Sequence, residues 1–131
     1  MKVLFVCSGN TCRSPMAMAL ARQMHPEWEV RSAGIYAFTG QALSANARIV
    51  LSEEGILLDH TAKKLLPEDL RWADHVFVMD EGQKSQVLDI LPHAPVRTLC
   101  EDPVLDPYGG SLTEYESTLE QMRQCLRRIQ L

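Results

Sequence analysis

The chain has 131 residues, of which 46% are hydrophobic and 23% are charged, and its formal net charge is −4. A chain of this length can form one domain whose core needs no support from a metal or a disulfide. The composition argues against non-specific nucleic-acid binding, which requires a basic excess. No apolar run reaches the roughly 20 residues that cross a bilayer.

The chain begins with a predicted strand that leads into a predicted helix. Residues 2–6, KVLFV, form an apolar run typical of a buried strand. Ser14 and Pro15 are the residue types of a helix N-cap and of the first helical position. Apolar residues then recur at every fourth position and mark the face expected to pack on the core: Met16, Leu20 and Met24.

The middle of the chain continues this alternation of strands and helices. Residues 28–34, WEVRSAG, predict a second strand, and a helix is expected from about Ser44 to Glu54, with Gly55 as its stop signal. Residues 66–73 predict a short helix with a proline in its first turn. The apolar run DHVFVM at residues 74–79 then predicts a third buried strand.

The last third predicts two helices and one strand. Residues 80–91 have helical character, and residues 96–99, VRTL, predict a fourth strand. Ser111 and Glu114 have the spacing of a capping box at the start of the C-terminal helix. That helix carries an apolar stripe formed by Leu112, Tyr115, Leu119, Met122, Leu126 and Ile129.

Strands that alternate with helices indicate a parallel, doubly wound sheet. We therefore predict an α/β fold with three layers (αβα), a four-stranded sheet and one domain that spans residues 1–131. Ligands of such sheets bind at the carboxyl ends of the strands, near a topological switch point. The loop after the first strand is the natural candidate for the site.

Residues 7–13 lie between the end of a strand and the start of a helix, where free backbone N–H groups attract anions. The loop has neither a dinucleotide-binding nor a Walker signature. It carries Cys7 and, six residues later, Arg13, whose guanidinium can bind two oxygens of one phosphate. A thiol at a helix N-terminus beside an arginine is expected to have a lowered pKa and to act as a nucleophile.

The four cysteines, Cys7, Cys12, Cys100 and Cys125, show no C-x-x-C pair and no histidine cluster, so we expect no zinc site and no other metal or cofactor. The start of the chain lacks a signal sequence, and we expect a cytoplasmic protein whose thiols are free. Cys100 and Cys125 are interpreted as core residues. All four histidines are interpreted as structural or surface residues.

The motifs CSGNTCRSP at residues 7–15 and DPYGG at residues 106–110 resemble the active-site loop and the general-acid segment of the low-molecular-weight protein tyrosine phosphatases. The combination of C-x5-R-S near the N-terminus with a late D-P-Y is specific, and the resemblance covers most of the chain in element order. It implies a single phosphatase domain. It also implies that Cys7 is the nucleophile, that Arg13 holds the phosphate and that the amides of residues 8–13 complete the cradle.

The resemblance also suggests roles for the other loop residues. Ser14 is expected to hydrogen-bond the thiolate, Asn10 to brace the loop and Gly9 to allow a close backbone approach. Cys12 is able in principle to form a disulfide with Cys7 under peroxide. The residues expected to contact the phosphate or the substrate are Ser8, Gly9, Asn10, Thr11, Cys12, Arg13, Ser14 and Tyr108.

The reaction also needs a proton donor for the leaving group. Asp102 and Asp106 both precede a proline, and spacing alone does not choose between them. The tyrosine and glycines that follow Asp106 match the family pattern, which implies that Asp106 is the general acid and then the base, and that Tyr108 forms a wall of the pocket. Asp102 is interpreted as a turn former.

Thr11 is the main indication of the substrate. Tyrosine-directed relatives usually have isoleucine there, whereas the bacterial protein-arginine phosphatases of the family resemble CTGNTCRSP. Tyr108 departs from that subgroup, where phenylalanine is expected at least as often. The resemblance therefore implies a monomeric, cofactor-free phosphatase that hydrolyses phosphoarginine on proteins through a phosphocysteine, with no nucleic-acid or membrane partner. Hydrolysis of phosphotyrosine is the alternative.

Three other classes are less consistent with these residues. Arsenate reductases of this fold need two closely spaced relay cysteines, but Cys100 and Cys125 are far apart in the sequence. A phosphocarrier would not need Arg13 together with an acidic aspartate. A non-catalytic anion-binding module would have no use for Cys7.

Overall fold

Four parallel strands form one sheet in the computed structural model, which describes residues 1–131. The sheet has the order β2-β1-β3-β4. Its strands are β1 (Lys2–Cys7), β2 (Glu29–Gly34), β3 (His75–Val78) and β4 (Val96–Thr98). The chain passes from β1 to β2 on one side and later to β3 on the other, so the carboxyl end of β1 is a topological switch point.

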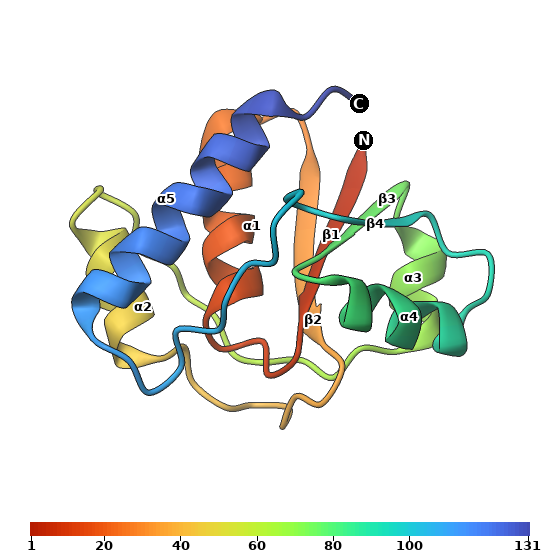
Figure 1. Cartoon of the computed structure of the whole chain (residues 1–131), viewed down its shortest axis with the longest axis horizontal. Helices are drawn as coiled ribbons and strands as arrows, with labels where there is room; N and C mark the ends of the chain where they lie inside the picture. The colour runs from red at the N-terminus through yellow and green to blue at the C-terminus, as the bar shows by residue number, and fades with distance from the viewer.

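Five helices cover the two faces of this sheet (Figure 1). They are α1 (Arg13–Met24), α2 (Ala45–Ser52), α3 (Pro67–Trp72), α4 (Glu81–Ile90) and α5 (Leu112–Arg128). Helices α1, α2 and α5 lie on one face, and α3 and α4 lie on the other. The predicted α/β fold with three layers and a four-stranded parallel sheet is confirmed.

Strand β1 divides the core because its side chains alternate between the two faces. Val3, Phe5 and Cys7 belong to the larger core under α1, α2 and α5. Leu4 and Val6 belong to the smaller core under α3 and α4. A strand buried on both faces has no polar alternation, which explains its continuous apolar run.

Helix α1 differs from the prediction in its start and in its burial. It begins at Arg13, with Cys12 as an N-cap that makes no side-chain capping bond, so the prediction of Ser14 as N-cap was wrong. The Ser14 hydroxyl instead lies 2.9 Å from the Cys7 sulfur. Every residue of 13–21 is buried, because α1 is packed between the sheet and α5.

The N-terminal ends of three other helices are capped by side chains; the cap at Ser111 was predicted, whereas the role of Asp80 was not. Ser44, Asp80 and Ser111 each accept a hydrogen bond from a backbone N–H in the first turn of α2, α4 and α5. Gly55 has a φ of 77° shortly after α2 ends. No helix combines the length and the apolar character needed to cross a membrane.

The cysteines of the C-terminal third contradict the expectation that all thiols are free. Cys100, which follows β4, is joined by a disulfide to Cys125 of α5, with a Cα–Cα distance of 5.5 Å. Cys7 and Cys12 are free and buried. The pair could not be predicted from the sequence, because the two cysteines are 25 residues apart. They meet because α5 returns along the sheet to the end of β4.

Candidate active site

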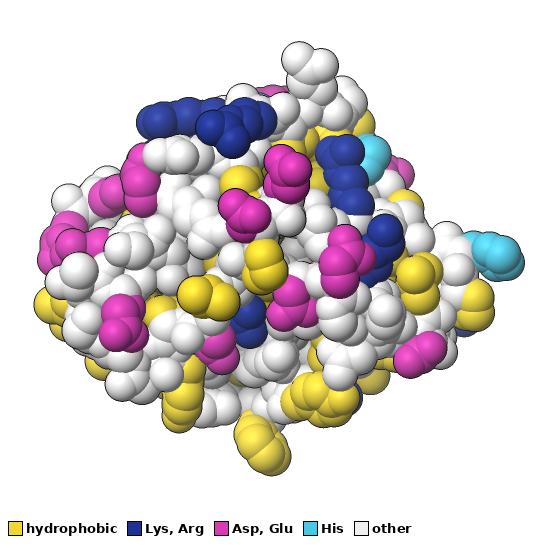
Figure 2. Space-filling view, in the orientation of Figure 1, with side chains coloured by type: hydrophobic (Ala, Val, Ile, Leu, Met, Phe, Trp, Pro, Cys, Tyr) yellow, Lys and Arg dark blue, Asp and Glu magenta, His cyan; other side chains and the backbone are white.

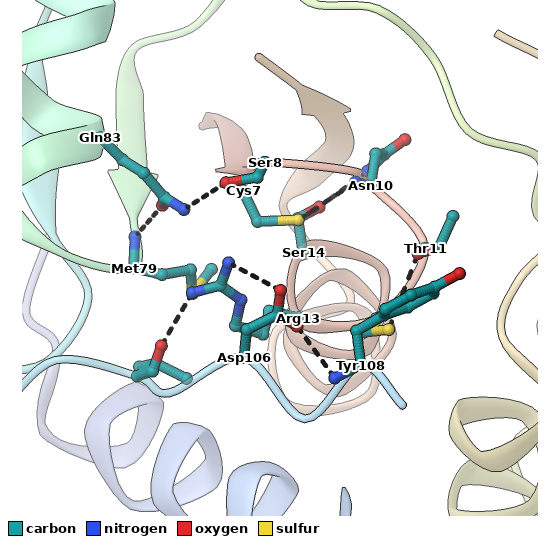
Figure 3. A network of polar contacts seen from close by, with 12 residues as sticks. Cys7, Ser8, Asn10, Thr11, Arg13, Ser14, Met79, Gln83, Asp106 and Tyr108 are labelled. Atoms are coloured by element: carbon teal, nitrogen blue, oxygen red, sulfur yellow. Dashed lines mark hydrogen bonds and ion pairs between the residues drawn. The ribbon is translucent and has the colours of Figure 1, made fainter. Parts of the chain in front are cut away.

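The sulfur of Cys7 lies at the centre of the loop that joins β1 to α1 (Figure 3). Cys7 is the last residue of β1 and is only 3% exposed. The Asn10 backbone N–H donates to its sulfur at 3.3 Å, and the Ser14 hydroxyl lies 2.9 Å away. The loop therefore curls around the thiol at the N-terminal end of α1, where the helix dipole favours negative charge.

The acidity of Cys7 differs from the sequence-based expectation. Burial raises the pKa of the Cys7 thiol above its usual value, although the hydrogen bond of Ser14, the charge of Arg13 and the Asn10 amide lower it in part. The expectation of a lowered pKa was wrong because it considered the arginine and the helix dipole but not the complete burial of the sulfur. Burial of the sulfur and the three groups around it therefore act in opposite directions on the pKa of Cys7.

Asn10 braces the loop through its side chain and its backbone. Its φ of 57° is left-handed, a conformation that asparagine tolerates. Its side-chain N–H groups donate to Ser14 Oγ at 2.7 Å and to Ser32 Oγ at 3.0 Å, and its Oδ1 accepts from the Lys63 backbone N–H at 2.9 Å. Its carbonyl is 2.8 Å from His60 Nε2. The nearby Ser14 and two segments distant in the sequence, β2 and residues 60–63, therefore hold this residue.

The close backbone approach at this loop involves Gly34 rather than Gly9. A Cβ atom on Gly34 would lie 2.7 Å from the Ser8 carbonyl oxygen and 2.9 Å from Asn10 Cβ, so no larger residue fits there. A Cβ atom on Gly9 would meet nothing closer than Thr11 Oγ1 at 3.8 Å. Only a bound molecule could therefore require a glycine at position 9.

Arg13 connects the loop to the segment that carries the acidic candidates. Its side chain is buried, and it donates to the Val104 carbonyl at 2.8 Å. Asp106 Oδ2 lies 3.7 Å from its other terminal nitrogen, and the Asp106 side chain is 51% exposed. Asp102 is exposed and its backbone carbonyl faces Gln121 of α5. The structure thus brings Asp106, and not Asp102, to Arg13.

A pocket of about 310 Å³ opens above the sulfur. It is lined by all seven loop residues of 7–13, by Asp106 and by Tyr108. Ser14 lies beneath it and is fully buried. Three further lining residues had no predicted role: Tyr36, Phe38 and Gln41.

Exposed aromatic side chains surround the mouth of this pocket. Tyr36, Phe38 and Tyr108 are 62%, 79% and 65% exposed. Figure 2 shows hydrophobic side chains along the lower edge of the molecule, where β1 and β2 end in Figure 1. The stretch IYAF at residues 35–38 could have indicated these pocket residues from the sequence. Its two aromatic side chains follow the predicted second strand, in a loop where they are not needed for the core of a strand or a helix.

Cys12 lies in the loop but contacts a different set of groups. Its sulfur is 3.3 Å from the Tyr115 hydroxyl and 3.4 Å from Ser44 Oγ. Burial raises the pKa of Tyr115 to about 12, so this phenol stays neutral. The hydroxyl of Thr11 is 3.7 Å from the Cys12 sulfur, and Thr11 lines the pocket.

Titratable residues elsewhere do not form a metal site. No group of three or more histidine, cysteine, aspartate or glutamate side chains lies in a ligating arrangement. His60 supports the loop at Asn10, and burial lowers its pKa. It is a structural histidine, as interpreted from the sequence, although no spacing in the sequence indicated its partner.

Comparison with known proteins identifies relatives over nearly the whole chain. Residues 2–130 match the family model described as low molecular weight phosphotyrosine protein phosphatase. The chain is 36% identical to a protein-arginine-phosphatase of Geobacillus stearothermophilus, over 98% of this chain and 93% of the relative. It is 30% identical to the low molecular weight protein-tyrosine-phosphatase PtpB of Staphylococcus haemolyticus, over 98% of this chain and 97% of the relative.

The fold also matches the structures of solved relatives. One is described as a C7S mutant of YwlE arginine phosphatase with a phosphorylated active site serine. It matches with a TM-score of 0.92 at 34% identity, and the match covers 97% of this chain and 91% of that one. The resemblance first indicated by the two motifs is confirmed.

Proposed function

Because this chain belongs to the low molecular weight phosphotyrosine protein phosphatase family, we propose that it hydrolyses phosphoarginine on proteins through a phosphocysteine at Cys7. Its relatives are named as protein-arginine and protein-tyrosine phosphatases, so the chain is a protein phosphatase. The single observation that carries the proposal is the enclosure of the Cys7 sulfur by a loop whose pocket also holds Arg13 and Asp106.

The first chemical step joins the Cys7 sulfur to phosphorus and breaks the bond between phosphorus and the leaving nitrogen. The thiol first gives its proton to solvent water, and the Ser14 hydroxyl, the Asn10 amide and the Arg13 guanidinium stabilise the thiolate that results. Asp106 is half-exposed and lines the pocket, so it can give its proton to the leaving guanidine nitrogen. The name of the relative with a phosphorylated serine in place of the active-site cysteine supports this step.

The second step releases the phosphoryl group to water. Asp106, now a carboxylate, accepts a proton from the water that attacks phosphorus, and the bond between sulfur and phosphorus breaks. Arg13 is held by the Val104 carbonyl with its guanidinium in the pocket, where it can bind two oxygens of the phosphoryl group in both steps. Products are inorganic phosphate and the Cys7 thiolate.

Preference for phosphoarginine rests on the acceptors of the pocket. A guanidinium is planar, charged and rich in donors, so it needs nearby acceptor oxygens. Thr11 Oγ1 and the carbonyl oxygen of the protonated Asp106 carboxyl both lie on the pocket wall and can supply them. The relative named as a protein-arginine-phosphatase supports the same preference.

Phosphotyrosine hydrolysis is the second candidate, and a specific observation favours it. Tyr36, Phe38 and Tyr108 line the pocket and expose their rings, which would stack on a substrate ring. Relatives named as tyrosine phosphatases are also similar over the whole chain.

Competing peptides of one sequence, carrying either phosphoarginine or phosphotyrosine, distinguish these two functions. We expect wild-type protein to have the higher kcat/KM on phosphoarginine. Thr11→Ile should move the ratio towards phosphotyrosine by about tenfold, the effect of losing one polar contact. Equal rates on both peptides, or a ratio that Thr11→Ile does not change, would favour the tyrosine phosphatase function.

A further inference from the structure

Gln83 is a buried amide that connects the catalytic loop to the neighbouring strand. It lies in the first turn of α4 and is only 3% exposed. The Met79 backbone N–H, at the end of β3, donates to its Oε1 at 2.9 Å. Its Nε2 lies 3.2 Å from the hydroxyl oxygen of Ser8, the residue that follows Cys7 (Figure 3). The side chain therefore spans from β3 to the loop.

The direction of these two hydrogen bonds determines what the Ser8 hydroxyl can do. A backbone N–H can only donate, so Met79 requires the amide oxygen of Gln83 and turns the amide N–H groups towards Ser8. Ser8 Oγ must then accept. Its own proton has no acceptor within hydrogen-bond distance in the protein, and Ser8 lines the pocket.

Ser8 is held on its other side through the backbone alone. Its carbonyl accepts from the Tyr36 N–H at 2.9 Å. The rest of the loop is braced through Asn10, whose partners lie on α1, β2 and the segment before α3. Gln83 is thus the side chain that orients the Ser8 hydroxyl, from the opposite side of the loop.

We propose that Gln83 is a positioning residue for the phosphatase reaction, which turns the Ser8 hydroxyl so that it donates its proton to a phosphoryl oxygen of the substrate. The hydroxyl adds a donor to the backbone amides and to Arg13. A donor fixed in advance needs no reorganisation during the reaction, so it stabilises the charge that develops on the phosphoryl group.

Two substitutions of Gln83 separate this role from a merely structural one. Gln83→Met has a similar length but removes both hydrogen bonds. Gln83→Glu keeps an acceptor for the Met79 N–H. Its second carboxylate oxygen accepts a hydrogen bond from the Ser8 hydroxyl, which then no longer points its proton into the pocket. Gln124→Glu, at an exposed position of α5, is the matched control for the added charge.

The first measurement is of kcat and KM with p-nitrophenyl phosphate. The second is the degree to which bound inorganic phosphate protects Cys7 from alkylation by iodoacetamide. Both are made for each variant, alone and combined with Ser8→Ala. We expect Ser8→Ala, Gln83→Met and Gln83→Glu each to lower kcat/KM by about tenfold. In the Ser8→Ala background, Gln83→Met should change kcat/KM by less than about twofold, because the group through which Gln83 acts is gone. Gln124→Glu should match wild type.

Two results would overturn the proposal. One is wild-type activity and phosphate protection in both Gln83→Met and Gln83→Glu. The other is a Gln83→Met loss that is as large in Ser8→Ala as in wild type, which would indicate a general loss of folding. If Gln83→Met fails to fold, Gln83→Glu and Ser8→Ala decide the question. Since p-nitrophenyl phosphate requires no preference for phosphoarginine, a wrong substrate assignment would change the peptide ratios and leave these comparisons intact.

Discussion

Asp106 lies 3.7 Å from Arg13 at the edge of the pocket, with its second oxygen accepting from the Tyr108 N–H at 3.0 Å. The backbone amide orients the carboxylate, and its 51% exposure leaves it able to exchange protons with water. Asp102, four residues earlier, does not line this pocket. This difference between two similar Asp-Pro pairs leads to the first prediction.

Asp106→Asn should slow turnover by roughly 10²- to 10⁴-fold, the effect typical of a lost general acid. The loss should be greatest for substrates with poor leaving groups, which depend most on protonation. Asp102→Asn is the matched control and should have little effect. Steady-state kinetics on a series of aryl phosphates measures both. A larger loss in Asp102→Asn would show that the other carboxylate supplies the proton.

The raised pKa of Cys7 predicts how its reactivity depends on pH. Burial raises this pKa and the Ser14 hydroxyl lowers it, so the thiolate fraction should increase as the pH rises beyond the usual range of a cysteine, about 8.5. Ser14→Ala removes a group that lowers the pKa and should shift the alkylation profile of Cys7 to still higher pH. Peptide-resolved mass spectrometry after iodoacetamide treatment measures the profile. A shift to lower pH in Ser14→Ala would contradict this account of the site.

Under mild peroxide, we expect Cys7 and Cys12 to form a reversible disulfide. Peroxide oxidises the Cys7 thiolate to a sulfenic acid, and the Cys12 sulfur then displaces that oxygen as water. Cys12 must first leave the Tyr115 hydroxyl, so Tyr115→Phe should form the disulfide faster. Peptide mapping of oxidised protein measures the rate. If peroxide inactivates Cys12→Ser to the same extent as wild type, and dithiothreitol restores the activity of both equally, then Cys12 does not protect the nucleophile.

The disulfide between Cys100 and Cys125 predicts a thiol count and a change in stability. Denatured wild-type protein without reductant should contain two reactive thiols, those of Cys7 and Cys12. Reduction should lower the free energy of unfolding by about 3.5 kcal/mol, the value expected for a closed loop of this length. Cys100→Ser with Cys125→Ser is the control and should be insensitive to reductant. Four reactive thiols in unreduced protein would contradict the pairing.

The fold could be predicted because its signals are local. A strand buried on both faces, such as β1, is a continuous apolar run, and the caps of α2, α4 and α5 are single residues with clear preferences. The loop motif likewise places Cys7 and Arg13 by the geometry of one turn. Those parts of the site depend on residues that are neighbours in the sequence.

The remainder depended on contacts between distant segments. Gln83 reaches Ser8 across 75 positions, and Cys100 pairs with Cys125 only because α5 returns to the end of β4. The periodicity of apolar residues in the sequence does not indicate such contacts between distant segments. The pKa of Cys7 was predicted in the wrong direction for the same reason, since the burial of its sulfur arises from the assembled core.

The phosphocysteine is the intermediate on which the proposed function depends, so trapping it tests the central claim most directly. Wild-type protein would be quenched in acid during turnover of a phosphoarginine peptide, and the phosphoryl group located by peptide mass spectrometry. We expect it on the peptide that contains Cys7, and we expect it to be absent in Cys7→Ala. Turnover of the phosphoarginine peptide by Cys7→Ala at the wild-type rate, or a phosphoryl group on another residue, would contradict the account.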